Sequence, residues 1–456
     1  MRDGSSAGAS PTERAEADGP SLSPQPSTLS SSEREALAVD GRLPRYVAAP
    51  GTADEAARIL AWAHETKLAV VPRGGGTRME LGNAPRAYDL ALSTQRLNRV
   101  LEHEPADLTV TVEAGLPLAE LQATLRQQGQ FLPLDPPAAD GSTIGGVVAA
   151  NASGPFRLRY GAARDLVIGT RVATTAGTLA RSGGKVVKNV TGYDLNKLYV
   201  GSLGTLGLIT ELTFKVQPLP ETEATLLARF PDRASACRCV YRVLRSPLTP
   251  SALEVSGIAV DPSTPLRTGP SASSGPATAL EVGLHAHLAG FRKPVDRMVS
   301  DLAGLARAEG ALSTQLLDDA SAAAAWGSLR DGPALRGGGA RLKIAVPISQ
   351  VVWAAEAAEG VAGQHGLRAL VVASAGTGIV RVGLDGEGDY LAAIRRLRAE
   401  VAERYGWVQV ERCPLPLKSE LDLLGEPGDS HPIMRRLKEQ LDPGAIMSPG
   451  RFLGRL

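Results

Sequence analysis

The stretch Val71-Pro72-Arg73-Gly74-Gly75-Gly76-Thr77-Arg78 follows the apolar residues Leu68-Ala69-Val70, and together they predict a short buried strand that ends in a glycine loop. Consecutive glycines let the backbone take positive φ and come close to a ligand. Exposed N–H groups in series then form a concavity for an anion, most simply a pyrophosphate. Arg73 and Thr77 add a positive charge and a hydroxyl group. On its own, the loop is equally consistent with a structural turn.

A second glycine-rich stretch, Gly141-Ser142-Thr143-Ile144-Gly145-Gly146, leads into small residues that continue to Gly154. It predicts a helix that begins at a Gly-Ser-Thr turn. The N-terminus of such a helix offers free N–H groups and a favourable dipole to a phosphate. A tightly packed helix pair with no ligand is the alternative, and the residues alone leave both open.

Bulk composition excludes several classes of protein. The 456 residues carry 49 Lys and Arg against 48 Asp and Glu, and aromatic residues make up only 4% of the chain, so neither a basic nucleic-acid surface nor a base-stacking platform is expected. Cys237, Cys239 and Cys413 form neither a disulfide framework nor a four-ligand zinc set. We expect no transmembrane segment and no signal peptide, hence a cytoplasmic protein that partners could hold at the inner face of a membrane.

Composition and periodicity predict an α+β protein with four parts. Residues 1–40 are expected to be a disordered tail, because a segment rich in Ser, Pro, Ala and Gly buries too little apolar surface. Residues 41–220 alternate strands and helices, residues 221–405 form one α+β domain, and residues 406–456 are a turn-rich C-terminal segment. The expected helices are 52–66, 117–125, 291–309 and 351–365, and the expected strands are 68–71, 87–92, 108–113, 166–173 and 208–216.

Taken together, the motifs resemble the vanillyl-alcohol oxidase type of FAD-binding fold, also called the PCMH-type flavoprotein domain. The resemblance covers about residues 42–220 and the last twenty or so. It implies a two-subdomain FAD-binding domain over residues 41–220, a cap domain over residues 221–405, and a C-terminal segment, residues 406–456, that returns to the FAD-binding domain. The matching segments are Pro72-Arg73-Gly74-Gly75-Gly76-Thr77, Asp135-Pro136, Thr143-Ile144-Gly145-Gly146 with Asn151 and Gly154, Tyr160-Gly161 with Asp165, Gly192-Tyr193-Asp194-Leu195, Gly201-Ser202-Leu203-Gly204-Thr205-Leu206-Gly207, Asp442-Pro443 and Pro449-Gly450-Arg451.

Within that family, the sequence is most similar to the FAD-binding E subunit of bacterial glycolate oxidase. The similarity rests on residues 183–194 and 201–205, and on Leu203, where the catalytic D subunit usually has Glu. It implies a complex with a homologous FAD-binding catalytic subunit and an iron–sulfur subunit that oxidises glycolate, a small 2-hydroxy acid, to glyoxylate.

The resemblance also implies a role for each motif. The first glycine loop carries no His for covalent attachment, so FAD is expected to bind non-covalently. Arg451 is expected either near the isoalloxazine or as a solvated terminal charge. The implied cofactor-binding residues are Arg73, Gly74, Gly75, Gly76, Thr77, Arg78, Asp135, Pro136, Thr143, Ile144, Gly145, Gly146, Asn151, Gly154, Leu206, Gly207 and Ile209.

Oxidising a 2-hydroxy acid needs a base for the hydroxyl proton, a cation for the carboxylate and the flavin as hydride acceptor. The metal-binding motif H-x-x-G-D-G-N-x-H of related dehydrogenases is absent, so no metal site is expected, and His285 and His287 are interpreted as ordinary strand histidines. The catalytic residues stay unassigned. Tyr193, Lys188 and Arg451 are candidates, with Lys185 a further polar group near the flavin. Tyr193 could equally be a packed side chain.

Three hypotheses for the function remain. The chain is a flavin-bearing subunit of a glycolate oxidase complex, a free-standing FAD-dependent dehydrogenase of another hydroxy acid or polyol, or a non-catalytic assembly subunit with a vestigial flavin site. A nicotinamide-binding domain is excluded, because no G-x-G-x-x-G follows the first strand with an acidic residue about twenty residues on.

We expect Gly75→Asp to abolish FAD retention, because the added carboxylate would meet the pyrophosphate. The measurement is the visible spectrum of the natively purified protein, followed by acid release of the flavin. Unchanged FAD occupancy would remove the loop from the cofactor site.

Overall fold

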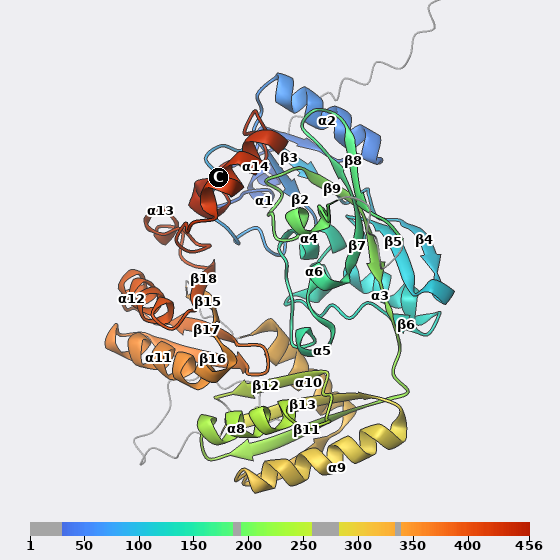
Figure 1. Cartoon of the computed structure of the whole chain (residues 1–456). Coiled ribbons are helices and arrows are strands. Elements are labelled where there is room, and N and C mark those ends of the chain that lie inside the picture. Colours follow the sequence, from blue (N-terminus) through green and yellow to red (C-terminus); the bar gives the residue numbers. More distant parts are fainter. Residues whose placement is uncertain (1–29, 186–192, 258–281, 333–338) are drawn as a thin grey trace, which may run out of the picture.

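The computed structural model describes residues 30–185, 193–257, 282–332 and 339–456. The described chain folds into an N-terminal lobe with a three-stranded, a five-stranded and a two-stranded sheet (β10-β6), and a cap lobe around an eight-stranded sheet (Figure 1). The C-terminal helix α14 (His431–Leu441) lies against the N-terminal lobe, so the chain crosses to the cap and returns.

A three-stranded parallel sheet, in the order β1-β3-β2, begins the N-terminal lobe. Its strands are β1 (Tyr46–Ala48), β3 (Leu90–Ser93) and β2 (Val70–Arg73). Helix α2 (Ala53–Glu65) connects β1 to β2 and begins after Thr52, whose hydroxyl accepts a hydrogen bond from the Glu55 N–H, as the capping sequence predicts. The glycine loop therefore leaves the carboxyl end of β2.

The second sheet of this lobe has five antiparallel strands in the order β4-β5-β9-β7-β8. Helices α3 and α4 pack on it, and Val110, Val112, Leu212 and Phe214 form the centre of a separate apolar core. The strands are β4 (Val100–Glu104), β5 (Thr109–Glu113), β9 (Leu208–Lys215), β7 (Val167–Ala173) and β8 (Leu179–Gly183); the remaining elements are α3 (Leu118–Arg126), β6 (Gln130–Phe131), α4 (Ile144–Ala149), α5 (Arg157–Tyr160), α6 (Ala163–Leu166), α7 (Asn196–Tyr199) and β10 (Gln217–Pro218).

The cap lobe is one antiparallel sheet in the order β14-β11-β13-β12-β16-β17-β15-β18. Helices α8, α9, α11 and α12 pack on one face of the sheet, and α10 packs on the other. The strands are β11 (Thr222–Phe230), β12 (Ala252–Ser256), β13 (Val282–Gly290), β14 (Ser313–Leu317), β15 (Ala340–Ala345), β16 (Arg368–Ser374), β17 (Ile379–Asp385) and β18 (Trp407–Arg412); the helices are α8 (Arg233–Leu244), α9 (Arg292–Ala308), α10 (Asp319–Asp331), α11 (Val351–Gln364) and α12 (Tyr390–Ala402).

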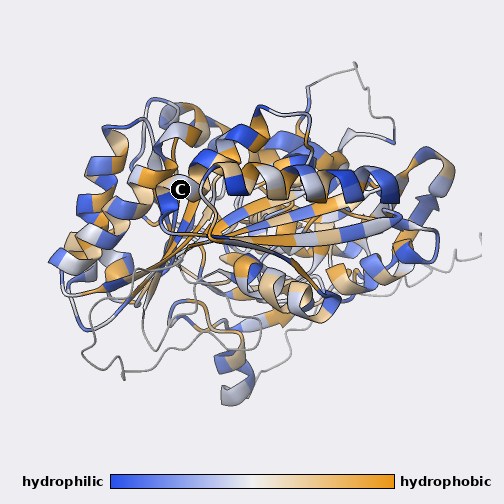
Figure 2. Cartoon of the chain, turned by 90° about the horizontal axis from the view of Figure 1, so that it is seen from below, coloured by the Kyte–Doolittle hydropathy of each residue, from blue (hydrophilic) through white to orange (hydrophobic). Residues whose placement is uncertain are grey.

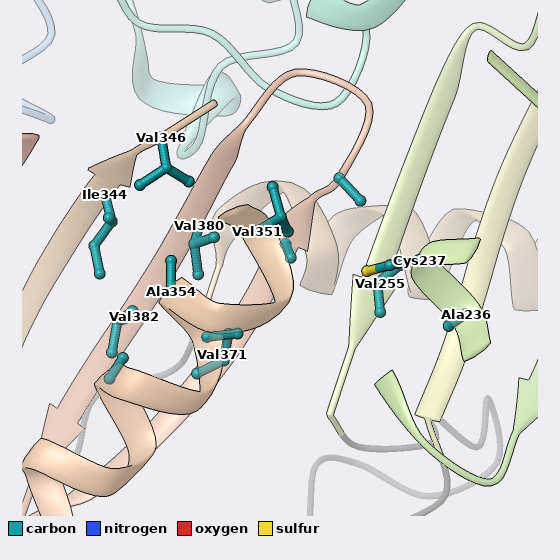
Figure 3. Close-up of a cluster of buried hydrophobic side chains, with 14 of the residues drawn as sticks. Ala236, Cys237, Val255, Ile344, Val346, Val351, Ala354, Val371, Val380 and Val382 are labelled. Atoms are coloured by element: carbon teal, nitrogen blue, oxygen red, sulfur yellow. The ribbon is translucent and has the colours of Figure 1, made fainter. Parts of the chain in front are cut away.

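Successive side chains of the cap strands alternate between an apolar and a polar face, as the period of a strand requires. Ile344, Val380 and Val382 face Val351 and Ala354 of α11 (Figure 3). The helices of the chain carry both hydrophilic and hydrophobic residues along their length (Figure 2), so they can bury one side against the sheet. The other face of the sheet is turned toward the N-terminal lobe.

Two expected boundaries need correction. Residues 30–40 do not belong to a disordered tail: α1 (Ser31–Ala36) begins at a capping box of Ser30 and Glu33, and Tyr88 donates to the Leu37 carbonyl at 3.1 Å. The cap does not end at residue 405, because β18 pairs with β15 and completes the eight-stranded sheet.

Two buried cations hold the turn that follows the glycine loop. Lys418 donates to the carbonyls of Glu80 (2.6 Å) and Gly82 (3.3 Å) and pairs with Asp40 at 2.7 Å. Arg451 donates to the carbonyls of Met79 (2.8 Å) and Leu81 (2.6 Å). This clasp of Lys418, Arg451 and Asp40 ties residues 79–82 to segments from both ends of the described chain.

We expect Lys418→Met to lower the free energy of unfolding by about 3 kcal/mol, because it leaves the buried Asp40 carboxylate without its nearer cation, with only Arg451 at 3.9 Å. Thermal unfolding of the FAD-loaded protein measures the change. Lys293→Met, on the exposed side of α9, serves as the control. Equal melting temperatures for the two variants would contradict a structural role for the clasp.

Candidate active site

The glycine loop after β2 forms one wall of a cleft of about 790 Å³ in the N-terminal lobe. Helix α4 forms the second wall, and residues 203–209, which lead into β9, form the third. The lining residues are Val71, Pro72, Arg73, Gly74, Gly75, Gly76, Thr77, Arg78, Met79, Thr94, Ala114, Thr143, Gly145, Gly146, Ala149, Ala150, Leu203, Gly204, Gly207, Leu208, Ile209 and Arg451.

The glycine loop offers a row of backbone donors to this cleft. The N–H groups of Gly74, Gly75, Gly76 and Thr77 donate no hydrogen bond to any residue that the structure describes. Gly76 has a φ of +76°, in the left-handed region that glycine adopts without strain. Successive free N–H groups on such a turn form an anion site, and the pyrophosphate of a dinucleotide satisfies them.

The two glycine-rich stretches lie against each other. A Cβ at Gly75 would overlap the Gly141 carbonyl oxygen, and a Cβ at Gly74 would overlap the Thr143 hydroxyl. A Cβ at Gly145 would lie 2.7 Å from that of Ala114. The loss of FAD expected for Gly75→Asp would therefore have a steric cause as well as an electrostatic one.

Arg78 joins the two stretches through its side chain. Its guanidinium donates to the Ser142 hydroxyl at 3.0 Å and to the Pro137 carbonyl, while the Thr77 and Ser142 hydroxyls are 3.2 Å apart. Burial lowers the pKa of Arg78, although Glu411 and Asp331 oppose the shift. Arg78 thus holds the two stretches together at the mouth of the cleft, on the side that faces the cap.

Several of the implied cofactor residues lie outside the lining of this cleft. Asp135 is half-buried and accepts hydrogen bonds from the N–H groups of Gly154 (3.2 Å) and Phe156 (2.9 Å). Asn151 lines a second cavity, described below. Ile144 and Leu206 pack in the core of the lobe, and Pro136 also lies outside the lining.

The candidate catalytic residues are scattered. Tyr193 is 92% exposed and lines none of the described cavities, so it is not a packed side chain either. Lys185 pairs with Glu102 at the surface, and Lys188 lies outside the described residues. Arg451 is only 3% exposed and lines the cleft, which rules out a solvated terminal charge.

A second cavity of about 930 Å³ lies between the lobes and adjoins the cleft, with which it shares Thr77, Arg78 and Ala150. Its floor is the polar face of β15, β17 and β18. It is rich in cations, with two carboxylates. The lining residues are Thr77, Arg78, Glu80, Leu81, Pro137, Ala138, Ala150, Asn151, Ala152, Ser153, Arg341, Lys343, Arg381, Gln409, Glu411 and Arg412.

Lys343 lies at the centre of this floor. It is the register partner of Arg381 on β17 and of Gln409 on β18. Burial lowers the pKa of Lys343, and the neighbouring Glu411 opposes that shift. Arg381 donates to the Ser153 carbonyl of the N-terminal lobe at 2.9 Å, and Arg412 pairs with Glu80 at 3.3 Å.

These cap residues were missed by the sequence analysis. Their signal is the alternation Ala340-Arg341-Leu342-Lys343-Ile344 and Val380-Arg381-Val382, where a basic residue stands between buried apolar ones. Alternation predicts a two-faced strand, but it does not say that the polar face is covered by another lobe rather than by water.

The paired histidines of β13 also face the covered side. Burial lowers the pKa of His285 to about 4, and the nearby positive charge of Arg229 adds to the shift. His287 contacts Trp326 and Phe156 and lies 3.8 Å from Glu223. Among the described residues, no group of three or more His, Cys, Asp and Glu side chains could hold a metal ion.

Comparison with known proteins identifies the class. Residues 44–183 match the family model described as "FAD binding domain", and residues 219–386 match "FAD linked oxidases, C-terminal domain". The glycolate oxidase subunit GlcD of Bacillus subtilis is 31% identical over 432 residues, covering 91% of this chain and 90% of that protein. The chain therefore belongs to the FAD-linked oxidase family, and it is an oxidoreductase with FAD as its cofactor.

The row of free N–H groups and the close glycine contacts fit FAD in the cleft. A structure of p-cresol methylhydroxylase has a TM-score of 0.67 at 16% identity, covering 90% of this chain and 88% of that one, which confirms the α+β, PCMH-type fold. In the described part of the chain, no helix is both long and apolar enough to cross a membrane.

The comparisons do not support the assignment to the E subunit in particular. The GlcE subunit of Escherichia coli is 40% identical, but only over 35% of this chain and 45% of that protein. The D-2-hydroxyglutarate dehydrogenase of Xanthomonas citri is 39% identical over 41% of this chain and 39% of its own length. Leu203 had suggested the E subunit. Leu203 lines the cleft, with a φ of +54°.

We expect the protein to be less stable at pH 8 than at pH 6, because burial raises the pKa values of Asp135 and Glu254 to about 7. Their carboxyl groups hold protons in the folded state at a pH where the unfolded chain has released them. Stability is therefore lost as the pH rises toward 7 and just beyond, by about 1 kcal/mol for each group between pH 6 and 8.

Glu254→Gln should reduce the difference in melting temperature between pH 6 and pH 8 by about 2–4 °C. Glu120→Gln, at an exposed position of α3, should leave the difference as it is. The same pH dependence in both variants would contradict the raised pKa of Glu254.

Proposed function

We propose that the chain oxidises a small 2-hydroxy acid, with glycolate as the first candidate, to the corresponding 2-oxo acid. The observation that carries the proposal is the cationic cavity of the cap, which directly adjoins the FAD cleft. A 2-hydroxy acid presents a carboxylate at one end and a reacting carbon next to it. The two adjoining cavities suit these two parts of the substrate.

In this proposal, Arg381 binds the substrate carboxylate and Lys343 lies beside it. A guanidinium forms paired, charge-assisted hydrogen bonds with a carboxylate, and these are stronger in a site shielded from water. Arg381 is 4% exposed and is held by the Ser153 carbonyl, so its direction is fixed before a substrate arrives.

The oxidation removes the hydroxyl proton and a hydride from the carbon that carries it. FAD supplies the two-electron acceptor when it is bound. Lys343 is the candidate base that accepts the hydroxyl proton. Because burial lowers its pKa, the unprotonated amine is more highly populated than that of a surface lysine. Glu411 lines the same cavity and can pair with Lys343 once the proton is held there.

The proposed assembly rests on the relatives of the chain. Two relatives are named as subunits of glycolate oxidase, and this supports a complex with a homologous FAD-binding subunit. An iron–sulfur subunit as electron acceptor, and a cytoplasmic location held at the membrane by partners, complete the proposal.

A free-standing dehydrogenase is the second candidate. The match to the D-2-hydroxyglutarate dehydrogenase favours it, as does the presence of both cavities within one chain. Turnover of a hydroxy acid by the isolated chain, with an artificial electron acceptor, would favour this candidate. A colourless protein after native purification would instead favour an assembly subunit with a vestigial flavin site.

We expect Arg381→Gln to raise the KM for glycolate by about 30-fold or more, since a truncated charge pair in a buried site costs at least about 2 kcal/mol. FAD occupancy, read from the visible spectrum, should not change. Arg368→Gln is the matched control, because Arg368 is on the adjacent strand but pairs with Asp385 away from the cavity. A KM unchanged by Arg381→Gln would exclude Arg381 from carboxylate binding.

A further inference from the structure

Strand β14 forms one edge of the cap sheet and is paired on one side only. In the sheet order, β14 and β18 are the two outer strands, and among the described residues β14 pairs with β11 alone. The neighbours of β14, which are β11 and α9, lie at the bottom of the cap in Figure 1, and β18 lies at its top. An outer strand presents unpaired backbone N–H and C=O groups to which a further strand can bind.

The two outer strands are protected to different degrees. On the outer side of β18, the Val410 N–H donates to the Leu423 carbonyl at 2.7 Å, and the strand carries the charged residues Glu411 and Arg412. Charged side chains and a covering segment are common means of preventing the pairing of an edge. In the part of the chain that the structure describes, β14 has neither, because its residues 313–317 are all uncharged and no segment other than β11 pairs with its backbone.

Two leucines on this edge are exposed. Leu312 is 61% exposed and Leu316 is 57% exposed. Leu312 continues the ladder beyond the end of β14, since its N–H donates to the Arg229 carbonyl of β11 at 2.7 Å. Residues four apart on a strand share a face, and Leu316 is the register partner of Leu226, which belongs to the apolar core under α9. A strand added to β14 on this edge would cover both leucines.

The charges on the two sides of β14 have opposite signs. Arg307, in the last turn of α9, precedes the strand, and Asp318 and Asp319 follow it directly; all three residues are exposed. Glu309 also precedes the strand, but it pairs with two arginines of α8. Antiparallel pairing of two identical strands brings the arginine of each copy toward the acids of the other, whereas parallel pairing sets like charges side by side. The flanking charges therefore favour an antiparallel second copy.

We propose that β14 is a homodimer interface, in which the strands of two copies pair antiparallel about a two-fold axis at Thr314 and join the two cap sheets into one. In this register, Leu312 of each copy lies opposite Leu316 of the other, and the two Thr314 residues face each other. Cross-strand pairs of this kind stabilise antiparallel sheets. The backbone hydrogen bonds supply affinity, and the two-fold axis makes the interface self-complementary.

This interface is remote from the two cavities. The FAD cleft lies in the N-terminal lobe, and the floor of the cationic cavity is formed by β15, β17 and β18, at the other end of the sheet order from β14. The dimer therefore leaves both cavities of each copy unobstructed, and its formation does not depend on the substrate of the chain. A homologous FAD-binding subunit would have to bind to a different surface.

The first test is sedimentation velocity of the FAD-loaded full chain. The fraction of dimer depends on the protein concentration, so the range from about 1 to 100 µM is measured. We expect Leu316→Lys to raise the Kd of the dimer by about 10-fold or more, because it replaces an apolar cross-strand pair twice in each dimer. Ile433→Lys is the matched control, at a residue of α14 that is 61% exposed, and it should leave the Kd unchanged.

The second test is a cross-link at the axis. Directly opposite residues of antiparallel strands have Cα atoms about 4.5–5.5 Å apart, which suits a disulfide. Mild oxidation should therefore link two copies of Thr314→Cys, while the three natural cysteines are buried. Ser430→Cys, at an exposed position before α14, should stay unlinked.

A monomer at every concentration, as expected if a different protein covers β14, would overturn the proposal. So would a dimer whose Kd is the same in Leu316→Lys, or a dimer that Thr314→Cys does not link. The cross-link decides the matter where Leu316→Lys does not fold. The visible spectrum of the flavin should be the same in all variants, because none of the substituted residues lines the FAD cleft.

Discussion

The cofactor site depends on one steric constraint, the contact of two backbone segments that have no side chains between them. Gly74 and Gly75 lie so close to residues 141–143 that a single Cβ would displace one segment from the other. This proximity brings the free N–H groups of the loop opposite α4 and defines the width of the cleft. The hydrogen bonds of Arg78 and Thr77 to Ser142 then fix the two segments laterally. The clasp of Lys418, Arg451 and Asp40 holds the end of the loop from behind.

The site in the cap, in contrast, depends on charged side chains and not on backbone contacts. Its sheet keeps one apolar face for the helices and gives the other a high density of charge, covered by the N-terminal lobe. A charged group in such a place is stabilised only by partners, and Arg381, Lys343, Glu254 and Glu411 supply them for one another. The lobes meet through polar contacts such as that between Arg381 and Ser153, and Leu158 of α5 also packs against the apolar core of the cap.

The sequence predicted the cofactor lobe far better than the cap. The first glycine loop, the capped helix α2 and the strands β5 and β9 depend on local signals, namely glycine spacing, a capping residue and alternation, and the structure has each of them within a few residues. The alternation around Lys343 and Arg381 predicts two-faced strands, but what the polar face meets depends on the pairing of β15 with β17 and on the lobe that covers it. The role of Arg451 was left open because its burial depends on Asp40, more than four hundred residues earlier. The placing of residues 30–40 in a disordered tail was wrong for the same reason, because composition does not reveal a distant partner.

The return of the C-terminal segment has a consequence for the order in which the protein is made. Val70 of β2 exchanges backbone hydrogen bonds with Ile446 and Ser448, and Arg451 completes the wall of the cleft. The glycine loop leaves the ribosome early, yet Ile446, Ser448, Lys418 and Arg451, which hold β2 and the turn after the loop, are synthesised after the whole cap. A nascent chain therefore carries the loop in an unfinished state through most of translation, and the site for the flavin closes only when the two regions meet.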